Sequence, residues 1–387
     1  MTGSARDLPE VPTGGAPVAA GPRTASGHDA AWLPFRAAVL RELEDFFASP
    51  AHRVPRSPGF PLLWERIREQ LAGGKLIRPR LTLIAWRSFA PVPRGGDAAA
   101  QVPDAACVRL AASFEMLHAA LLVHDDVVDQ DWRRRGRPTV GELFRRDALA
   151  AGVGEEEAEH AGSSAAVLAG DLLLAGALRL ATTCTTDPGR SRAVADVVFE
   201  AVTASAAGEL DDLLLSLHRF GAEHPDVQAI LDMERLKTAT YSFEAPLRAG
   251  ALLAGAGTDD AERLARAGAL LGVGYQVVDD VLGTFGDPEV TGKSVDADLR
   301  SGKATVLTAH GMQVPGVRRV LEDLASGAAT VARAREAIAD SGAREAALQL
   351  AAGLVGQARE LLDGLALPQA QRAQLDVLCH HVLNRDS

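Results

Sequence analysis

Aromatic residues make up only 4% of this 387-residue chain, although 47% of it is hydrophobic. Alanine and leucine dominate the hydrophobic residues. Sheets favour aromatic and β-branched residues, whereas alanine and leucine favour helices. The composition therefore predicts an all-α fold, and neither a strand pattern nor a short internal repeat stands out.

Cysteine is scarce as well. Cys107, Cys184 and Cys379 are far apart and form no CxxC spacing. This pattern disfavours a disulfide framework and favours a reducing compartment, with all three thiols as core fillers.

Long uninterrupted apolar runs are also missing. The N-terminus is polar and rich in Gly, Pro and Ala, unlike a signal peptide. The most apolar later run, residues 165–180, contains Asp171 and Arg179, which favours a buried helix over a membrane span. We therefore expect a cytoplasmic protein without a membrane span.

Positive charge is in deficit, with 40 Lys and Arg against 51 Asp and Glu and a net charge of −11. A nucleic-acid partner is disfavoured because no basic surplus exists to neutralise a phosphate backbone. A small diphosphate ligand is not excluded, since local arginines and bound metal decide that affinity.

The chemistry gathers first in residues 113–129. Side chains spaced by three or four residues share one face of a helix, and this stretch places five there: Glu115, His118, Leu122, Asp125 and Asp129. Asp126 lies about 100° round from Asp125, close enough to reach the same ligand. Three carboxylates at the end of an apolar helix need a cation, because burying them uncompensated is costly.

A group of arginines follows at once, in residues 133–137. Guanidinium groups suit bidentate contacts to phosphate. Carboxylates beside arginines predict a site for a polyphosphate carried by divalent metal. The alternative is a solvated helix end with surface ion pairs.

The chain otherwise divides into a tail and a helical region. Residues 1–30 lack hydrophobic periodicity and are predicted to be a disordered tail. Helical patterns then run to residue 383, and Gly154–Glu157 is expected to be a solvated acidic loop. The main predicted helices span residues 31–47, 104–130, 139–149, 161–183, 191–218, 225–240 and 259–285, with three or four more after 314.

A second acidic site closes the helix over 259–285. Asp279 and Asp280 are adjacent, and Gln276 lies one turn before Asp280. Gly-rich loops carrying Lys293 and Lys303 follow. The chain thus has a near-symmetry, in which an Asp-Asp pair twice ends a long apolar helix with cations after it.

Two other stretches carry cations. Gly73-Gly74-Lys75 and Arg78 begin a helix, where free backbone N–H groups favour anions; an ordinary helix start with a proline is the alternative. Lys237 and Thr238 precede Pro246, which should distort the helix and free backbone carbonyls to face a cavity.

In this order, these motifs resemble the trans-isoprenyl diphosphate synthases (polyprenyl synthetases), most closely the bacterial geranylgeranyl diphosphate synthases. The resemblance covers about residues 31–383 and implies, for residues 31–387, one large helical bundle with a central cavity, and a homodimer. The matching motifs are Gly-Gly-Lys75-x-x-Arg78, Glu115-x-x-His118, Asp125-Asp126-x-x-Asp129, Arg134-Arg135, Gly170-Asp171, Lys237-Thr238, Gln276-x-x-Asp279-Asp280, Gly-Lys293 and Gly-Lys303.

The resemblance implies Mg2+-dependent joining of isopentenyl diphosphate to an allylic diphosphate (dimethylallyl, geranyl or farnesyl), with three Mg2+ ions bound beside the allylic diphosphate. It assigns metal binding to Asp125, Asp126, Asp129, Asp279 and Asp280. It assigns the allylic diphosphate to Arg134, Lys237, Lys293 and Lys303, and isopentenyl diphosphate to Lys75, Arg78, His118 and Arg135. Thr238 and Gln276 would stabilise the allylic cation; with Asp125, Asp126, Asp279 and Lys237 they form the implied catalytic set.

Two positions depart from the family pattern. Gly283 stands where the fuller second motif has a third Asp, which would weaken or rearrange metal binding. Glu209 stands where many members have glutamine, with little effect expected on the chemistry.

The helix before Asp125 bears on product length, because one turn rises about 5.4 Å, similar to one isoprene unit. Ala120 and Leu121 lie one turn back and Leu117 and Phe114 farther back. Since neither near residue is a bulky aromatic, we predict mainly a C20 product. A farnesyl or longer-chain synthase and an inactive partner subunit of a heteromeric synthase stay as alternatives. A terpene cyclase is disfavoured because it needs no second diphosphate site.

Overall fold

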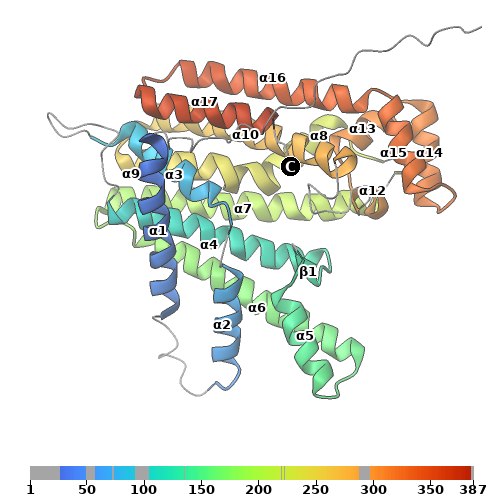
Figure 1. The fold of residues 1–387 in the computed structure, drawn as a ribbon, viewed down its shortest axis with the longest axis horizontal. Coiled ribbons are helices and arrows are strands. Elements are labelled where there is room, and N and C mark those ends of the chain that lie inside the picture. Colours follow the sequence, from blue (N-terminus) through green and yellow to red (C-terminus); the bar gives the residue numbers. More distant parts are fainter. Residues whose placement is uncertain are drawn as a thin grey trace, which may run out of the picture.

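The computed structural model describes residues 27–48, 57–71, 74–91, 104–134, 136–218, 220–221, 223–286 and 297–384, and these are almost entirely helical (Figure 1). The all-α prediction is confirmed. The helices are α1 (Gly27–Ala48), α2 (Phe60–Gln70), α3 (Ile77–Phe89), α4 (Ala105–Val128), α5 (Val140–Ala150), α6 (Glu155–Thr182), α7 (Pro188–His218), α8 (Val227–Glu234), η3 (Arg235–Glu244), α9 (Ala245–Ala254), α10 (Thr258–Phe285), α12 (Ala297–Ser301), α13 (Val306–Met312), α14 (Pro315–Ala325), α15 (Val331–Asp340), α16 (Ala343–Asp363) and α17 (Gln369–Leu383).

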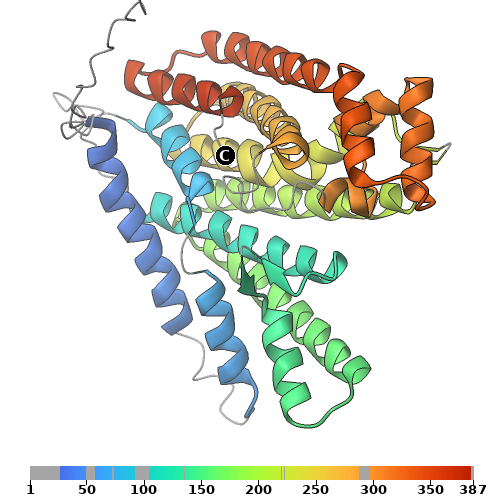
Figure 2. The same ribbon diagram turned by 45° about the vertical axis from the view of Figure 1, so that its right-hand side comes forward.

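Three long helices form the centre of the bundle. α4 packs against α6 and α3, α7 packs against η3 and α9, and α10 packs against η3 and α16. Figure 2 shows the blue helices α1 and α2 and the green α5 splayed away from the red C-terminal helices. In Figure 1, β1, which follows α4, and α12, which follows α10, lie on the same side of the molecule.

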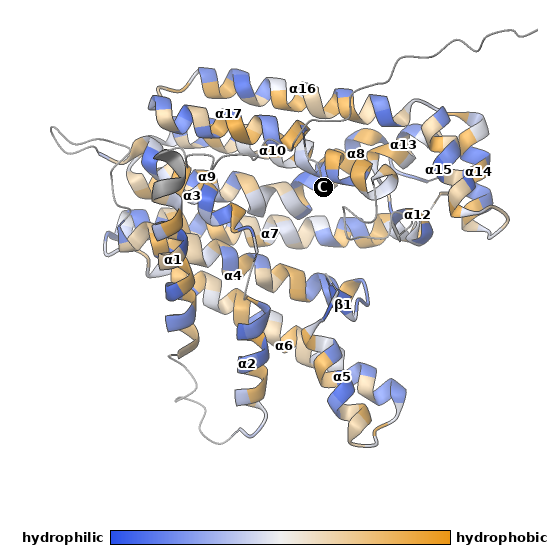
Figure 3. Cartoon of the chain, in the orientation of Figure 1, coloured by the Kyte–Doolittle hydropathy of each residue, from blue (hydrophilic) through white to orange (hydrophobic). Residues whose placement is uncertain are grey.

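The core explains why α4 shows no strong amphipathic pattern. Its residues from Leu110 to Leu117 are all buried, so it packs on every side, as expected for a helix that is apolar all round. Its chain direction then changes at Asp129, after which polar residues dominate. Figure 3 shows hydrophilic residues at β1 and α12, on the side where α4 and α10 end.

Some predicted boundaries were wrong. Glu155–Glu157 do not form a loop but the first turn of α6, where acidic side chains are favoured by the helix dipole. A hairpin of two strands with two residues each, β1 (Arg133–Arg134) and β2 (Arg137–Pro138), was also missed. Its strands are too short to show the alternating pattern of a β-strand. Of the predicted tail, residues 27–30 belong to α1 and residues 1–26 lie outside the described residues.

Two described helices, α4 and α6, are long and apolar enough to cross a membrane by length and composition. α4 is largely buried within the bundle, and 44% of the most apolar window of α6 is buried. The absence of a membrane span therefore stays a prediction.

Candidate active site

The end of α4 forms the first acidic site. Asp104 caps the start of the helix by accepting from the backbone N–H of Cys107. Asp125 and Asp126 lie in the last turn, and Asp129 follows as the C-terminal cap. Negative side chains are disfavoured at a helix C-terminus by the helix dipole, so this cluster depends on neighbouring cations.

Arg134 supplies one of those cations from the β1–β2 hairpin. Its Nη2 atom lies 2.5 Å from Asp125 Oδ2 and its Nε atom 2.5 Å from Asp126 Oδ1. The hairpin turns at Gly136, whose φ of +76° favours glycine. Burial lowers the pKa of Arg134, but the two aspartates outweigh it and raise the pKa overall. The predicted neighbour Arg135 lies outside the described residues.

Lys237 of η3 supplies a second cation. Its Nζ atom lies 2.5 Å from Asp212 Oδ2, 3.2 Å from Glu209 Oε1 and 3.4 Å from Asp125 Oδ1. Burial lowers the pKa of Lys237, but Asp212, Asp125 and Glu209 together raise it. Asp212 and Glu209 were not predicted as site residues. Their spacing of three in Gly208-Glu-Leu-Asp-Asp212, which puts both on one helix face, was the available signal.

The segment that carries Lys237 is a π-helix, which confirms the predicted distortion before Pro246. The N–H of Ala245 donates to the carbonyl of Thr240, five residues back. Pro246 has no N–H to continue an α-helical ladder, and so favours this wider turn. Thr238 is half-buried on the same π-helical turn as Lys237.

The end of α10 forms the second acidic site. Asp280 is 3% exposed, and its Oδ1 atom accepts from Gln276 Nε2 at 3.1 Å and lies 3.7 Å from Lys303 Nζ. The negative charge of Asp280, with those of other nearby acids, raises the pKa of Lys303, although burial lowers it. Asp279 is half-buried beside it. The predicted Lys293 lies outside the described residues.

The two sites carry more negative than positive charge. Burial raises the pKa of Asp126 to about 6 even though Arg134 opposes the rise, and burial also raises the pKa of Asp129 and Glu209. The Oδ2 atom of buried Asp280 has no hydrogen-bond donor among the described residues. Among the described residues, no three His, Cys, Asp or Glu side chains form a preassembled metal site. Mg2+ prefers one or two carboxylates with phosphate oxygens and water, so these acids would bind it together with a diphosphate.

A second cationic group lies around Arg78 of α3. Its Nη2 atom donates to Ser242 Oγ at 2.7 Å and to Tyr241 Oη at 3.2 Å, and its guanidinium lies 4.7 Å from the Tyr241 ring centre. Tyr241 Oη is also 3.4 Å from Nδ1 of His118. The structure thus brings the predicted Arg78 and His118 together through Tyr241. Lys75 is exposed on the loop before α3.

The Gly170-Asp171 motif of α6 packs beside the C-terminal end of α4. A Cβ atom at Gly170 would lie 2.2 Å from Nε2 of His124, so glycine is needed for the imidazole to fit. His124 Nε2 lies 3.4 Å from Asp171 Oδ1. His124 therefore packs α4 against α6 next to Asp125.

The predicted chain-length residues lie within one core cluster. Phe114, Leu117 and Ala120 are fully buried, and Leu121 is half-buried and packs against the same cluster. Because all four lie on α4, their distance from Asp125 increases from Leu121 back to Phe114.

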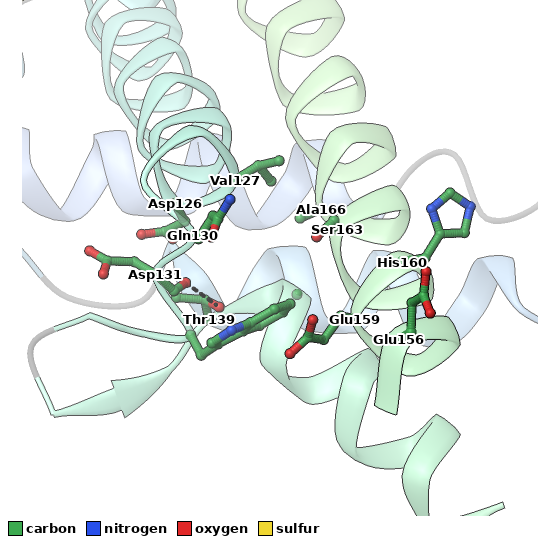
Figure 4. Close-up of a pocket in the computed structure, with 12 residues that line it drawn as sticks. Asp126, Val127, Gln130, Asp131, Thr139, Glu156, Glu159, His160, Ser163 and Ala166 are labelled. Atoms are coloured by element: carbon green, nitrogen blue, oxygen red, sulfur yellow. Dashed lines mark hydrogen bonds between the residues drawn. The ribbon is translucent and has the colours of Figure 1, made fainter. Parts of the chain in front are cut away.

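A cavity of ≈ 400 Å³ adjoins Asp126 on the side of α6 (Figure 4). Apart from His160, its charged or titratable lining residues are all acidic, so it does not suit a diphosphate. The lining residues are Asp126, Val127, Gln130, Asp131, Trp132, Thr139, Gly141, Glu156, Glu159, His160, Ser163 and Ala166.

Comparison with known proteins identifies relatives with named activities. The polyprenyl synthetase family model matches residues 61–340. The chain is 33% identical over 321 residues to geranylfarnesyl diphosphate synthase of Aeropyrum pernix, covering 81% of this chain and 91% of that protein. It is 32% identical over 325 residues to (2E,6E)-farnesyl diphosphate synthase of Mycobacterium bovis, covering 81% of this chain and 80% of that protein.

Among solved structures, geranylgeranyl pyrophosphate synthase from Corynebacterium glutamicum, complexed with isoprenyl diphosphate and magnesium, has a TM-score of 0.78. It is 30% identical, and the match covers 91% of this chain and 98% of that one. The relatives therefore agree on the class of reaction and differ in the length of the product named.

Proposed function

The chain is a prenyltransferase of the polyprenyl synthetase family, and on that premise we propose that it makes mainly geranylgeranyl diphosphate. It joins isopentenyl diphosphate head-to-tail to an allylic diphosphate (dimethylallyl, geranyl or farnesyl) and releases diphosphate. The observation that carries the proposal is the meeting of Arg134 and Lys237 at Asp125. Cations suited to phosphate lie there beside carboxylates suited to metal.

The carboxylates at the ends of α4 and α10 would hold the metal. Asp125, Asp126, Asp129, Asp279 and Asp280 form the proposed donor set, for three Mg2+ ions. Bound Mg2+ supplies Lewis-acid stabilisation of the charge that develops on the leaving diphosphate.

The protein's own cations bind the same diphosphate. Arg134 offers a planar fork that suits two phosphate oxygens, whereas Lys237 and Lys303 act as point charges. Lys293 joins them by family resemblance. The hydrogen bonds and ionic contacts of these donors stabilise the charge that develops on the leaving diphosphate most strongly where water is excluded.

The allylic carbon–oxygen bond then breaks and leaves a carbocation. Gln276 donates its amide N–H to Asp280, which leaves its carbonyl oxygen available to face positive charge. The hydroxyl of Thr238 and the carbonyls of the π-helix provide further dipoles at the same place.

Isopentenyl diphosphate binds on the side of Arg78 and His118, with Lys75 and Arg135 as further contacts. Its double bond attacks the carbocation and forms the new carbon–carbon bond. The proton that it loses passes to the released diphosphate, so no protein nucleophile is needed.

Product length follows from α4. Ala120 is small and Leu121 medium-sized, so the tail extends past them towards Leu117 and Phe114. Leu117 and Phe114, two and three turns before Asp125, form the proposed floor for a mainly C20 product. Among the relatives, geranylfarnesyl, geranylgeranyl and farnesyl synthases all occur, so they do not decide the length.

The protein acts as a homodimer in this proposal, and in the cytoplasm. Apolar side chains stay exposed along α6 and α7, and a second copy of the chain would cover them. On α7, Leu210, Leu214 and Leu217 recur at helical spacing, and Leu217 is 70% exposed. Light scattering after size-exclusion chromatography gives the mass that tests this.

The function is tested by incubating purified protein with isopentenyl diphosphate, each of the three primers and Mg2+. Chain-length analysis should show mainly C20 product, none in EDTA and little with Asp125→Asn. Products that stop at C15 would make the chain a farnesyl diphosphate synthase, and products beyond C20 a longer-chain synthase. No product from any primer would instead support an inactive partner subunit.

A further inference from the structure

Ser242 of η3 holds the guanidinium of Arg78 more closely than Tyr241 does. Its Oγ atom accepts from Arg78 Nη2 at 2.7 Å, whereas the Tyr241 hydroxyl accepts from the same nitrogen at 3.2 Å. Ser242 is 3% exposed and Tyr241 is 7% exposed, so both acceptors are buried. Hydrogen bonds from a charged donor are stronger than those between neutral groups, and water has little access to compete here. The two hydroxyls therefore fix the orientation of the guanidinium.

One N–H group of Arg78 stays available to a ligand in this orientation. Nη2 carries two hydrogens, which the two hydroxyls occupy. The Nε atom is buried, and no acceptor among the described residues reaches it. A buried donor on a charged group is costly when it lacks an acceptor, so an anionic oxygen that accepts from Nε would stabilise the arrangement.

The backbone on either side of Ser242 is held tightly against α10. A Cβ atom at Gly272 would lie 2.9 Å from the Cα atom of Ala239, and one at Gly268 would lie 3.1 Å from the carbonyl oxygen of Phe243. Glycine at both positions lets the π-helix approach α10 closely. Ser242 therefore has a fixed place from which it can orient a side chain of α3.

We propose that Ser242 is a positioning residue for isopentenyl diphosphate, because it holds Arg78 with the guanidinium ready for the diphosphate of that substrate. This inference rests on the proposed function, which puts isopentenyl diphosphate on the side of Arg78 and His118. Lys237, a proposed ligand of the allylic diphosphate, belongs to the same π-helix. One segment thus places a cation for each substrate, and loss of the Ser242 hydroxyl affects only one of the two.

Ser242→Ala tests the proposal, because it removes the hydroxyl and little else. In steady-state assays of the full chain with dimethylallyl diphosphate as primer, we expect KM for isopentenyl diphosphate to rise by about 10- to 30-fold. KM for the primer and the circular dichroism spectrum should not change. Ser88→Ala is the matched control, because Ser88 is a buried serine of α3 whose hydroxyl donates to the carbonyl of Ile84. It should leave both KM values as in the wild type.

A double-mutant cycle shows whether Ser242 acts through Arg78. Arg78→Lys keeps the positive charge but loses the guanidinium that the two hydroxyls orient. Adding Ser242→Ala to Arg78→Lys should raise KM for isopentenyl diphosphate by less than about twofold further. Effects that multiply in the double variant would overturn the inference, as would an equal rise of both KM values in Ser242→Ala.

The inference and the proposed function can fail separately. If the wild type makes product and Ser242→Ala keeps its KM for isopentenyl diphosphate, only the role of Ser242 fails. If the wild type makes no product, the proposed function fails and the inference fails with it. Should Ser242→Ala not fold, Ser242→Cys is the second variant, because its thiol is similar in size but a weak acceptor. It should raise the same KM, and a wild-type value would contradict the proposal.

Discussion

Gly208 of α7 packs directly against the backbone of Lys237, where a Cβ atom would lie 2.2 Å from the backbone nitrogen. No side chain other than hydrogen fits between the two segments. This close approach brings Lys237 within reach of Asp212 on α7 and Asp125 on α4. A glycine with no chemistry of its own thus sets the position of a predicted diphosphate ligand.

Gly208→Ala should therefore lower activity by displacing Lys237. The clash is with backbone, which cannot rotate away, so we expect kcat to fall by about 10- to 100-fold and stability by about 1–3 kcal/mol. Steady-state kinetics and thermal unfolding measure both. Gly353→Ala on α16 is the control, because nothing lies within 4 Å of its added Cβ. If both variants behave alike, Gly208 does not position Lys237.

Ala120→Phe should shorten the product. A phenyl ring one turn before Asp125 would close the path along α4 near the diphosphate, so products of C15 or less should replace C20. Chain-length analysis of the products measures this. Phe114→Ala is the complementary variant and should lengthen the products by at least one isoprene unit. Unchanged product lengths in both variants would refute the floor argument.

Tyr241→Phe should weaken the binding of isopentenyl diphosphate alone. The lost hydroxyl accepts from Arg78 and lies near His118, so its removal loosens that side of the site. We expect KM for isopentenyl diphosphate to rise by about 3- to 10-fold, while KM for the allylic primer stays the same. Tyr275→Phe, whose ring contacts Phe243, is the control. A rise in the primer's KM instead would place Tyr241 on the allylic side.

The metal-free protein should lose stability as Asp126 ionises. Burial raises the pKa of Asp126 to about 6, Arg134 opposes the rise, and Asp125 and Asp131 add to it. The native state thus holds this proton more tightly than the unfolded chain, and its stabilising effect is lost as pH rises from about 4 to about 6. Asp126→Asn cannot titrate. Calorimetry in EDTA should show that the Tm of Asp126→Asn rises relative to that of the wild type as pH increases from about 4 to about 6. A Tm difference that does not change with pH would contradict this account.

Much of the site could be predicted because it depends on local helical spacing. Asp125, Asp126 and Asp129 share a helix end, and Arg134 follows within one short hairpin. The structure places that arginine against the aspartates. Such contacts depend on residues close in sequence, which periodicity describes well.

Other residues could not be found in this way. The π-helix adds a residue to the turn, so a period of 3.6 does not predict that Tyr241 and Ser242 face Arg78. Arg78 and Ser242 are far apart in sequence, and only the folded chain brings them together.

The central claim is that the ends of α4 and α10 bind one pyrophosphate together through Mg2+. Calorimetric titration with pyrophosphate, with and without Mg2+, tests it in the wild type, Asp125→Asn and Asp279→Asn. The account predicts one Mg2+-dependent site per chain, weakened at least about tenfold by either substitution. Full affinity in either variant would contradict it, because one acidic helix end would then be enough.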